Sequence, residues 1–127
     1  MLIVYDSLMG KTERFVKKTK LPSIKITENL KVDEPFVLIT YTTGGRNQPP
    51  TPPKSTFEFL ERNSNFLLGV ASSGHKNWGT DRFARAGNVI SQQYNVPLIH
   101  KFEMSGMPND VQIFVEGVKQ LYEKNIS

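Results

Sequence analysis

Four short runs of almost continuous apolar residues divide this chain. They cover residues 2–5, 36–41, 66–71 and 98–102. A strand with one solvent-exposed face alternates apolar and polar side chains, whereas a continuous apolar run is typical of a strand covered on both faces. We therefore expect the four runs to form buried strands of a sheet that has helices on both sides.

Segments with the apolar spacing of helices separate these runs. The periodicity predicts helices over residues 12–19, 55–63, 80–94 and 109–124. Ser55 and Glu58 have the spacing of a capping box at the start of the second helix. Because strands and helices alternate with short connections, the strands should be parallel and joined by right-handed crossovers.

A weaker run at residues 23–26 predicts an edge strand, which brings the sheet to five strands. The predicted fold is a single α/β domain over residues 1–127, a three-layer sandwich with a five-stranded parallel sheet in the order 2-1-3-4-5. Residues 27–35 are too few for a full crossover helix, so we expect an extended or single-turn connection there. Residues 46–54 contain four prolines and predict a stiff loop after the third strand.

The amino-acid composition limits the kinds of site and partner that this chain can have. The chain has no cysteine, which excludes disulfides, thiolate metal sites and iron–sulfur clusters, so any redox chemistry needs a bound cofactor. The net charge of +4 is spread along the chain and no nucleic-acid motif accompanies it, so we expect no nucleic-acid partner. No apolar run approaches the roughly 20 residues of a membrane span, so we expect a cytoplasmic protein without a membrane contact.

The first apolar run leads directly into a turn that could hold a phosphate. Ser7, Gly10, Lys11 and Thr12 precede a helix whose free amides and dipole favour an anion. The turn is not a nucleotide-triphosphate loop, because that motif requires a glycine where this chain has Tyr5. A tight turn that binds nothing remains an equal alternative at this point.

Two further strand ends carry polar and glycine-rich segments. Residues 40–45 offer hydroxyls and paired glycines, and residues 71–79 place the only Trp between two glycines. Glycines let backbone amides approach a ring edge, and Trp can stack on a planar ligand. The candidate ring-binding residues are Thr40, Tyr41, Thr42, Thr43, Gly44, Gly45, Ser73, Gly74, His75, Asn77, Trp78 and Gly79.

Other catalytic classes lack their motifs. His75 and His100 are far apart and belong to no metal-ligand pattern, so we expect no metal site. Ser72 and Ser73 do not lie in a G-x-S-x-G motif, which argues against a serine hydrolase.

The strand-end segments together resemble the flavodoxin superfamily, and within it the NrdI family of activator proteins of class Ib ribonucleotide reductase. The resemblance covers nearly the whole chain. Its most specific parts are Gly74 to Gly79, Arg85-Ala86-Gly87 and Phe102 to Gly106. It implies an FMN cofactor with its ring against the two loops. The residues that it implies around the phosphate are Ser7, Met9, Gly10, Lys11 and Thr12, although Met9 stands where such turns usually carry a hydroxyl.

The resemblance also implies a function and partners. Reduced FMN would react with oxygen and supply superoxide for assembly of the dimanganese–tyrosyl radical cofactor. The partners would be the small, dimanganese subunit of class Ib ribonucleotide reductase and an unidentified flavin reductant. The chain would then be an activator rather than a turnover enzyme. Two alternatives stay open, namely a general flavodoxin-type electron carrier and a module of the same fold that binds another phosphate-bearing ligand or only a protein.

Overall fold

The computed structural model describes residues 1–45, 48–76, 79 and 82–126. Its main sheet has five strands, all parallel, in the order β2-β1-β3-β6-β7. Counted along the chain within this sheet, the order is 2-1-3-4-5, which confirms the predicted topology. The strands are β1 (Leu2–Tyr5), β2 (Ser23–Lys25), β3 (Phe36–Tyr41), β6 (Leu67–Gly74) and β7 (Leu98–Glu103).

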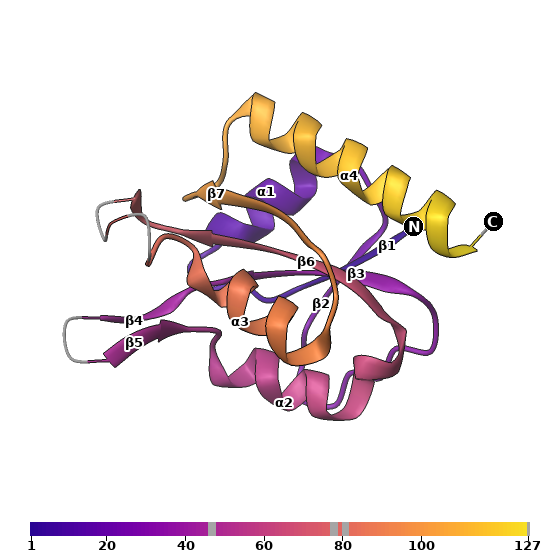
Figure 1. Cartoon of the computed structure of the whole chain (residues 1–127), viewed down its shortest axis with the longest axis horizontal. Coiled ribbons are helices and arrows are strands. Elements are labelled where there is room, and N and C mark those ends of the chain that lie inside the picture. Colours follow the sequence, from indigo (N-terminus) through magenta and orange to yellow (C-terminus); the bar gives the residue numbers. More distant parts are fainter. Residues whose placement is uncertain (46–47, 77–78, 80–81, 127) are drawn as a thin grey trace.

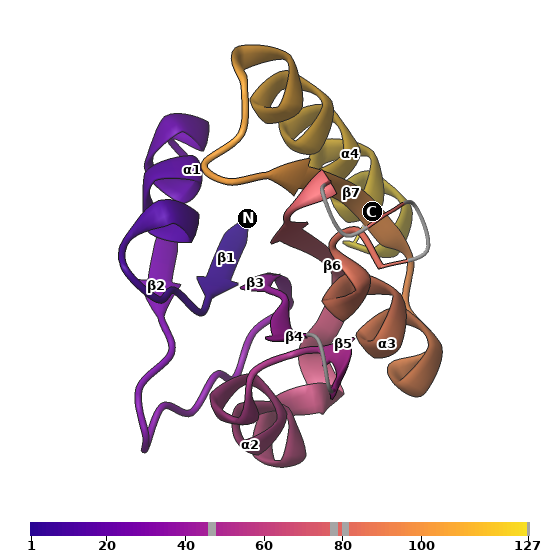
Figure 2. The same ribbon diagram turned by 90° about the vertical axis from the view of Figure 1, so that its left-hand side faces the viewer.

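Helices cover both faces of this sheet, as Figures 1 and 2 show. One pair packs on the first face and the other pair on the opposite face, which makes the predicted three layers. The first pair is α1 (Lys11–Thr19) and α4 (Pro108–Ile126), and the second is α2 (Lys54–Asn63) and α3 (Arg85–Tyr94). A short 3-10 helix, η1 (Ser64–Phe66), follows α2.

The central strands supply two cores, because successive side chains point to opposite faces. Ile3 packs with the α1 and α4 side chains, whereas Val4 packs with those of α2 and α3. Phe15 of α1 lies stacked on Phe102 of β7 with ring centroids 3.8 Å apart. Both phenylalanines are almost fully buried, and this pair fixes α1 against the far edge of the sheet.

The segment after β3 differs from the prediction. The four prolines predict a loop over residues 46–54, but β4 (Thr43–Gly45) and β5 (Gln48–Thr51) form an antiparallel two-stranded sheet. Proline has no amide hydrogen and is tolerated in strands that leave one edge unpaired, as both strands of this sheet do. Gly44 has φ +114 and a Cβ there would lie 2.7 Å from the Pro49 oxygen, so the close approach of these strands requires glycine.

The predicted start of α3 and the predicted cap of α2 are also wrong. α3 begins at Arg85 rather than at residue 80, since residues 82–84 form a turn and Ala84 has the left-handed φ of +49. No side chain caps α2, and the Ser55 hydroxyl donates to Asp6 instead of forming a capping box. The prediction of an extended or single-turn connection over residues 27–35 is confirmed, since this segment contains one turn and no helix. Asn63 of α2 holds it by accepting from the Val32 amide and donating to the Leu30 carbonyl.

Candidate functional site

The predicted phosphate turn joins β1 to α1 at the carboxyl end of the sheet. Met9 and Gly10 both have left-handed backbones, with φ of +61 and +85. Gly10 is the N-cap of α1 and provides no side-chain cap, and a Cβ built on it would meet nothing within 4 Å. The turn therefore presents an open helix N-terminus, where amide hydrogens and the helix dipole favour an anion.

The side chains of this turn take different positions. The Ser7 hydroxyl accepts the Glu13 amide at 3.3 Å, so it supports the first turn of α1 from outside the helix. Thr12 is buried, whereas Met9 is 88% exposed and points its side chain away from the protein. Met9 has no hydroxyl to offer a phosphate. The candidate phosphate ligands are therefore the backbone amides of the turn and Lys11 at the first position of α1.

Asp6 connects the turn after β1 to the start of α2. Its carboxylate accepts hydrogen bonds from the hydroxyls of Ser55 and Thr56 in the first turn of α2, the second at 2.8 Å. The dipole of α2 also stabilises a negative charge at this end of the helix. The Thr40 hydroxyl lies 2.8 Å from that of Thr56 and is fully buried. Thr40 therefore belongs to a buried network that joins β3, α2 and the turn after β1.

The remaining residues of the 40–45 segment lie at the surface of the sheet's carboxyl edge. Tyr41 and Thr42 are half-buried and Thr43 is exposed. Burial raises the pKa of the Tyr41 hydroxyl, and the charge of Asp6 raises it further, so Tyr41 stays a neutral hydrogen-bond donor at physiological pH. Thr42 continues the pairing of β3 with β6 through its amide, which donates to the Ser73 carbonyl at 3.1 Å.

In the 71–79 segment the first described residues are buried strand and the last ones are exposed. Ser73 is buried at the end of β6, and Gly74 lies against Ala84 so closely that a Cβ would be 2.5 Å from the Ala84 nitrogen. His75 is exposed, and Gly79 has φ +91 and accepts the amides of the turn that leads into α3. Asn77 and Trp78, the predicted amide and stacking residues, lie outside the described residues.

Cationic groups gather beside this loop. The Lys76 and Lys101 ammonium groups lie 5.7 and 5.9 Å from the centre of the Phe83 ring. Burial lowers the pKa of Lys101, and the nearby positive charge of Arg85 lowers it further. Such a positive environment stabilises a ligand that gains negative charge.

Glu103 is a site residue that the sequence reasoning did not select. Its carboxylate accepts the Lys76 amide at 3.0 Å, which fixes the start of the 75–83 loop to the end of β7. Gly74 and Glu103 are partners in the β6–β7 register. The positions of the two predicted strands could have revealed this contact, because the ends of adjacent parallel strands meet at one edge.

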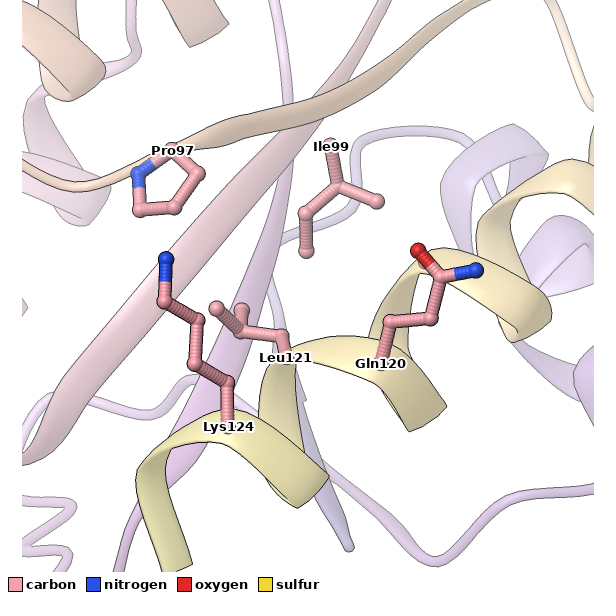
Figure 3. Close-up of a pocket in the computed structure, with 6 residues that line it drawn as sticks. Pro97, Ile99, Gln120, Leu121 and Lys124 are labelled. Carbon is pink, nitrogen blue, oxygen red and sulfur yellow. The ribbon is translucent and has the colours of Figure 1, made fainter.

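Among the described residues, cavities lie at both ends of strand β7. One of about 410 Å³ opens at its carboxyl end, and its lining includes Lys76, Phe83 and Glu103. Another of about 240 Å³ lies between the start of β7 and the second half of α4, where Pro97, Ile99 and Leu121 line it (Figure 3). The first adjoins the candidate site, whereas the second is at the amino end of the strand.

The described residues contain no group of three or more metal-ligating side chains that could hold an ion. None of the helices in these ranges has both the length and the apolar character of a membrane span. What the structure does bring together at one edge is a phosphate-type turn and the described parts of two polar strand-end segments. This arrangement fits a phosphorylated planar molecule such as FMN.

The fold and the position of this site define a flavodoxin-like protein. Solved structures of the same fold include oxidised Flavodoxin 2 from Bacillus cereus, with a TM-score of 0.68 and 18% identity over 97% of both chains. Two-electron reduced Megasphaera elsdenii flavodoxin has a TM-score of 0.64 and 14% identity, covering 94% of this chain and 99% of that one. At these identities the likeness concerns the fold.

Sequence comparison makes the assignment more specific. The chain belongs to the NrdI flavodoxin-like family, whose sequence pattern it matches over residues 3–116. It is 47% identical to Protein NrdI of Bacillus licheniformis over 97% of this chain and 91% of that protein. It is 43% identical to Protein NrdI of Macrococcus caseolyticus over 97% of this chain and 92% of that protein. This flavodoxin-like family and fold support FMN as the cofactor.

Proposed function

We propose that this chain is an FMN-binding redox activator of ribonucleotide reductase. The observation that carries the proposal is the meeting of an open helix N-terminus and two polar loops at one sheet edge, in a chain of the NrdI family. Ser7 and Gly10 to Thr12 would hold the phosphate. The loops at 41–45 and 73–79 would flank the ring, with Trp78 as the proposed stacking residue.

Bound FMN would supply the redox chemistry. After two-electron reduction by an external donor it would give one electron to each of two O₂ molecules, which would become superoxide. The superoxide would oxidise the dimanganese site in the small subunit of class Ib ribonucleotide reductase, and a tyrosyl radical would form there. The positive charges of Lys76, Lys101 and Arg85 would favour the reduced, negatively charged flavin before oxygen arrives.

The test is reconstitution of a manganese-loaded small subunit with the reduced protein and O₂. The tyrosyl radical is measured by electron paramagnetic resonance, and the same protein without flavin serves as control. We expect a radical only with flavin, reductant and O₂ together. If the protein binds FMN and passes electrons to unrelated acceptors but produces no radical, it is a general electron carrier instead.

A further inference from the structure

Thr42 joins the two loops that are proposed to flank the flavin. Its amide donates to the carbonyl of Ser73 at 3.1 Å, which ties it to the end of β6. Its hydroxyl oxygen accepts the amide of Ala86 at 3.1 Å, which ties it to the first turn of α3. One residue of the 40–45 segment therefore contacts the residues on both sides of the segment 74–84, Ser73 and Ala86.

The first turn of α3 takes its caps from other elements. Its N-cap, Ala84, offers no side-chain hydrogen bond. The Ala86 amide donates to Thr42, and the Gly87 amide donates to the Ser72 hydroxyl at 2.9 Å. Ser72 and Thr42 thus satisfy two of the amide groups that a helix start leaves without partners.

The two capping hydroxyls differ in whether their own proton has an acceptor. Ser72 is fully buried, and its own proton goes to the Ala84 carbonyl at 2.6 Å. Thr42 is half-buried, and among the described residues nothing accepts its hydroxyl proton. Because the oxygen of Thr42 already accepts the Ala86 amide, its proton must be directed elsewhere than toward α3.

We propose that the Thr42 hydroxyl donates a hydrogen bond to the flavin ring and thereby favours the reduced cofactor. The proposal rests on the proposed function, which places FMN between the two loops. A hydroxyl that accepts a hydrogen bond becomes a stronger donor, and the N-terminus of α3 adds a favourable potential for negative charge. The reduced flavin carries more negative charge than the oxidised flavin, so it gains more from this donor.

The decisive experiment is an anaerobic redox titration of the FMN-loaded protein and of the T42V variant, with the affinity for oxidised FMN measured separately. We expect T42V to lose about tenfold more affinity for reduced than for oxidised FMN, which lowers the two-electron potential by about 30 mV. The T42S variant keeps the hydroxyl and should restore the potential.

A matched control separates this effect from simple loosening of α3. Ser91 donates to the Val96 carbonyl at 2.6 Å at the other end of the same helix. S91A should lower the stability of the protein and leave the potential unchanged. If T42V weakens both redox states equally, Thr42 only holds α3 and the donor role is wrong. If the unaltered protein binds no FMN at all, the proposed function fails first, and this inference fails with it.

Discussion

Substitution of Gly74 by alanine tests how the ring loop is held. The new Cβ would lie 2.5 Å from the Ala84 nitrogen and 2.7 Å from its Cα. The first distance is about 0.9 Å shorter than the 3.4 Å at which ordinary contacts begin. Both neighbours are backbone atoms of Ala84 rather than the end of a flexible side chain. The Ala84 carbonyl also accepts a hydrogen bond from the buried Ser72 hydroxyl. The backbone itself must therefore move.

We expect the free energy of unfolding of G74A to fall by about 1–3 kcal/mol, the usual cost of overpacking. FMN affinity should fall at least tenfold, since a displacement of about 1 Å in a positioning group can cost two orders of magnitude. Urea unfolding measures the first effect and a fluorescence titration with FMN measures the second.

Gly69 on the same strand provides the matched control. A Cβ at Gly69 would meet the methyl ends of Leu121 and Ile99, at 2.8 and 3.1 Å, and these side chains can rotate away. G69A should cost less than about 1 kcal/mol and leave FMN affinity unchanged. Equal stability and equal FMN affinity in G74A and the unaltered protein would refute the reasoning, because Ala84 would then not pack against Gly74.

Two further predictions concern side chains outside the flavin contacts. The Asp110 carboxylate lies 2.7 Å from the His100 ring nitrogen; burial raises its pKa, but the Met107 amide, His100 and Lys76 outweigh this and lower it overall. The stability that Asp110 contributes is thus present above the ordinary carboxyl pKa of 3.8 and is lost as pH falls through the lowered value. D110N should be less stable by about 1–2 kcal/mol at pH 7, and thermal unfolding should show the difference closing below pH 3.8; a constant difference would contradict the pairing. N63A removes the acceptor of the buried Val32 amide and should cost about 2–3 kcal/mol in urea unfolding. Its FMN affinity should not change, and a lower affinity would show that the 27–35 connection affects the site.

Much of this fold could be predicted because its strands are buried on both faces. A continuous apolar run as short as residues 36–41 is typical of a buried strand, and the strand order follows from short crossovers. The two-stranded sheet β4–β5 was missed because proline and glycine are poor strand formers in general. Only the pairing of Thr43 with Thr51 and of Gly45 with Gln48 makes strands of these residues.

The site could be predicted in outline, but its internal bonds could not. Strand-end composition indicates the three segments, because parallel strands bring their carboxyl ends to one edge. The role of Thr40 cannot be read from the sequence, since its hydroxyl bonds to Thr56 in a helix that begins more than ten residues later. Ser55 has the spacing of a cap, but α2 begins one residue earlier at Lys54, so Ser55 lies within the helix and its hydroxyl donates to the Asp6 carboxylate.

The most direct test of the central claim is a comparison of FMN with riboflavin in a fluorescence titration of the purified, flavin-free protein. The two ligands share the ring system, and only FMN carries the phosphate that the turn at Gly10–Thr12 would hold. We predict strong quenching on binding of FMN and an affinity at least a hundredfold weaker for riboflavin, since charged hydrogen bonds contribute about 1.5–3 kcal/mol each. Equal affinity for both flavins, or binding of neither, would contradict the account.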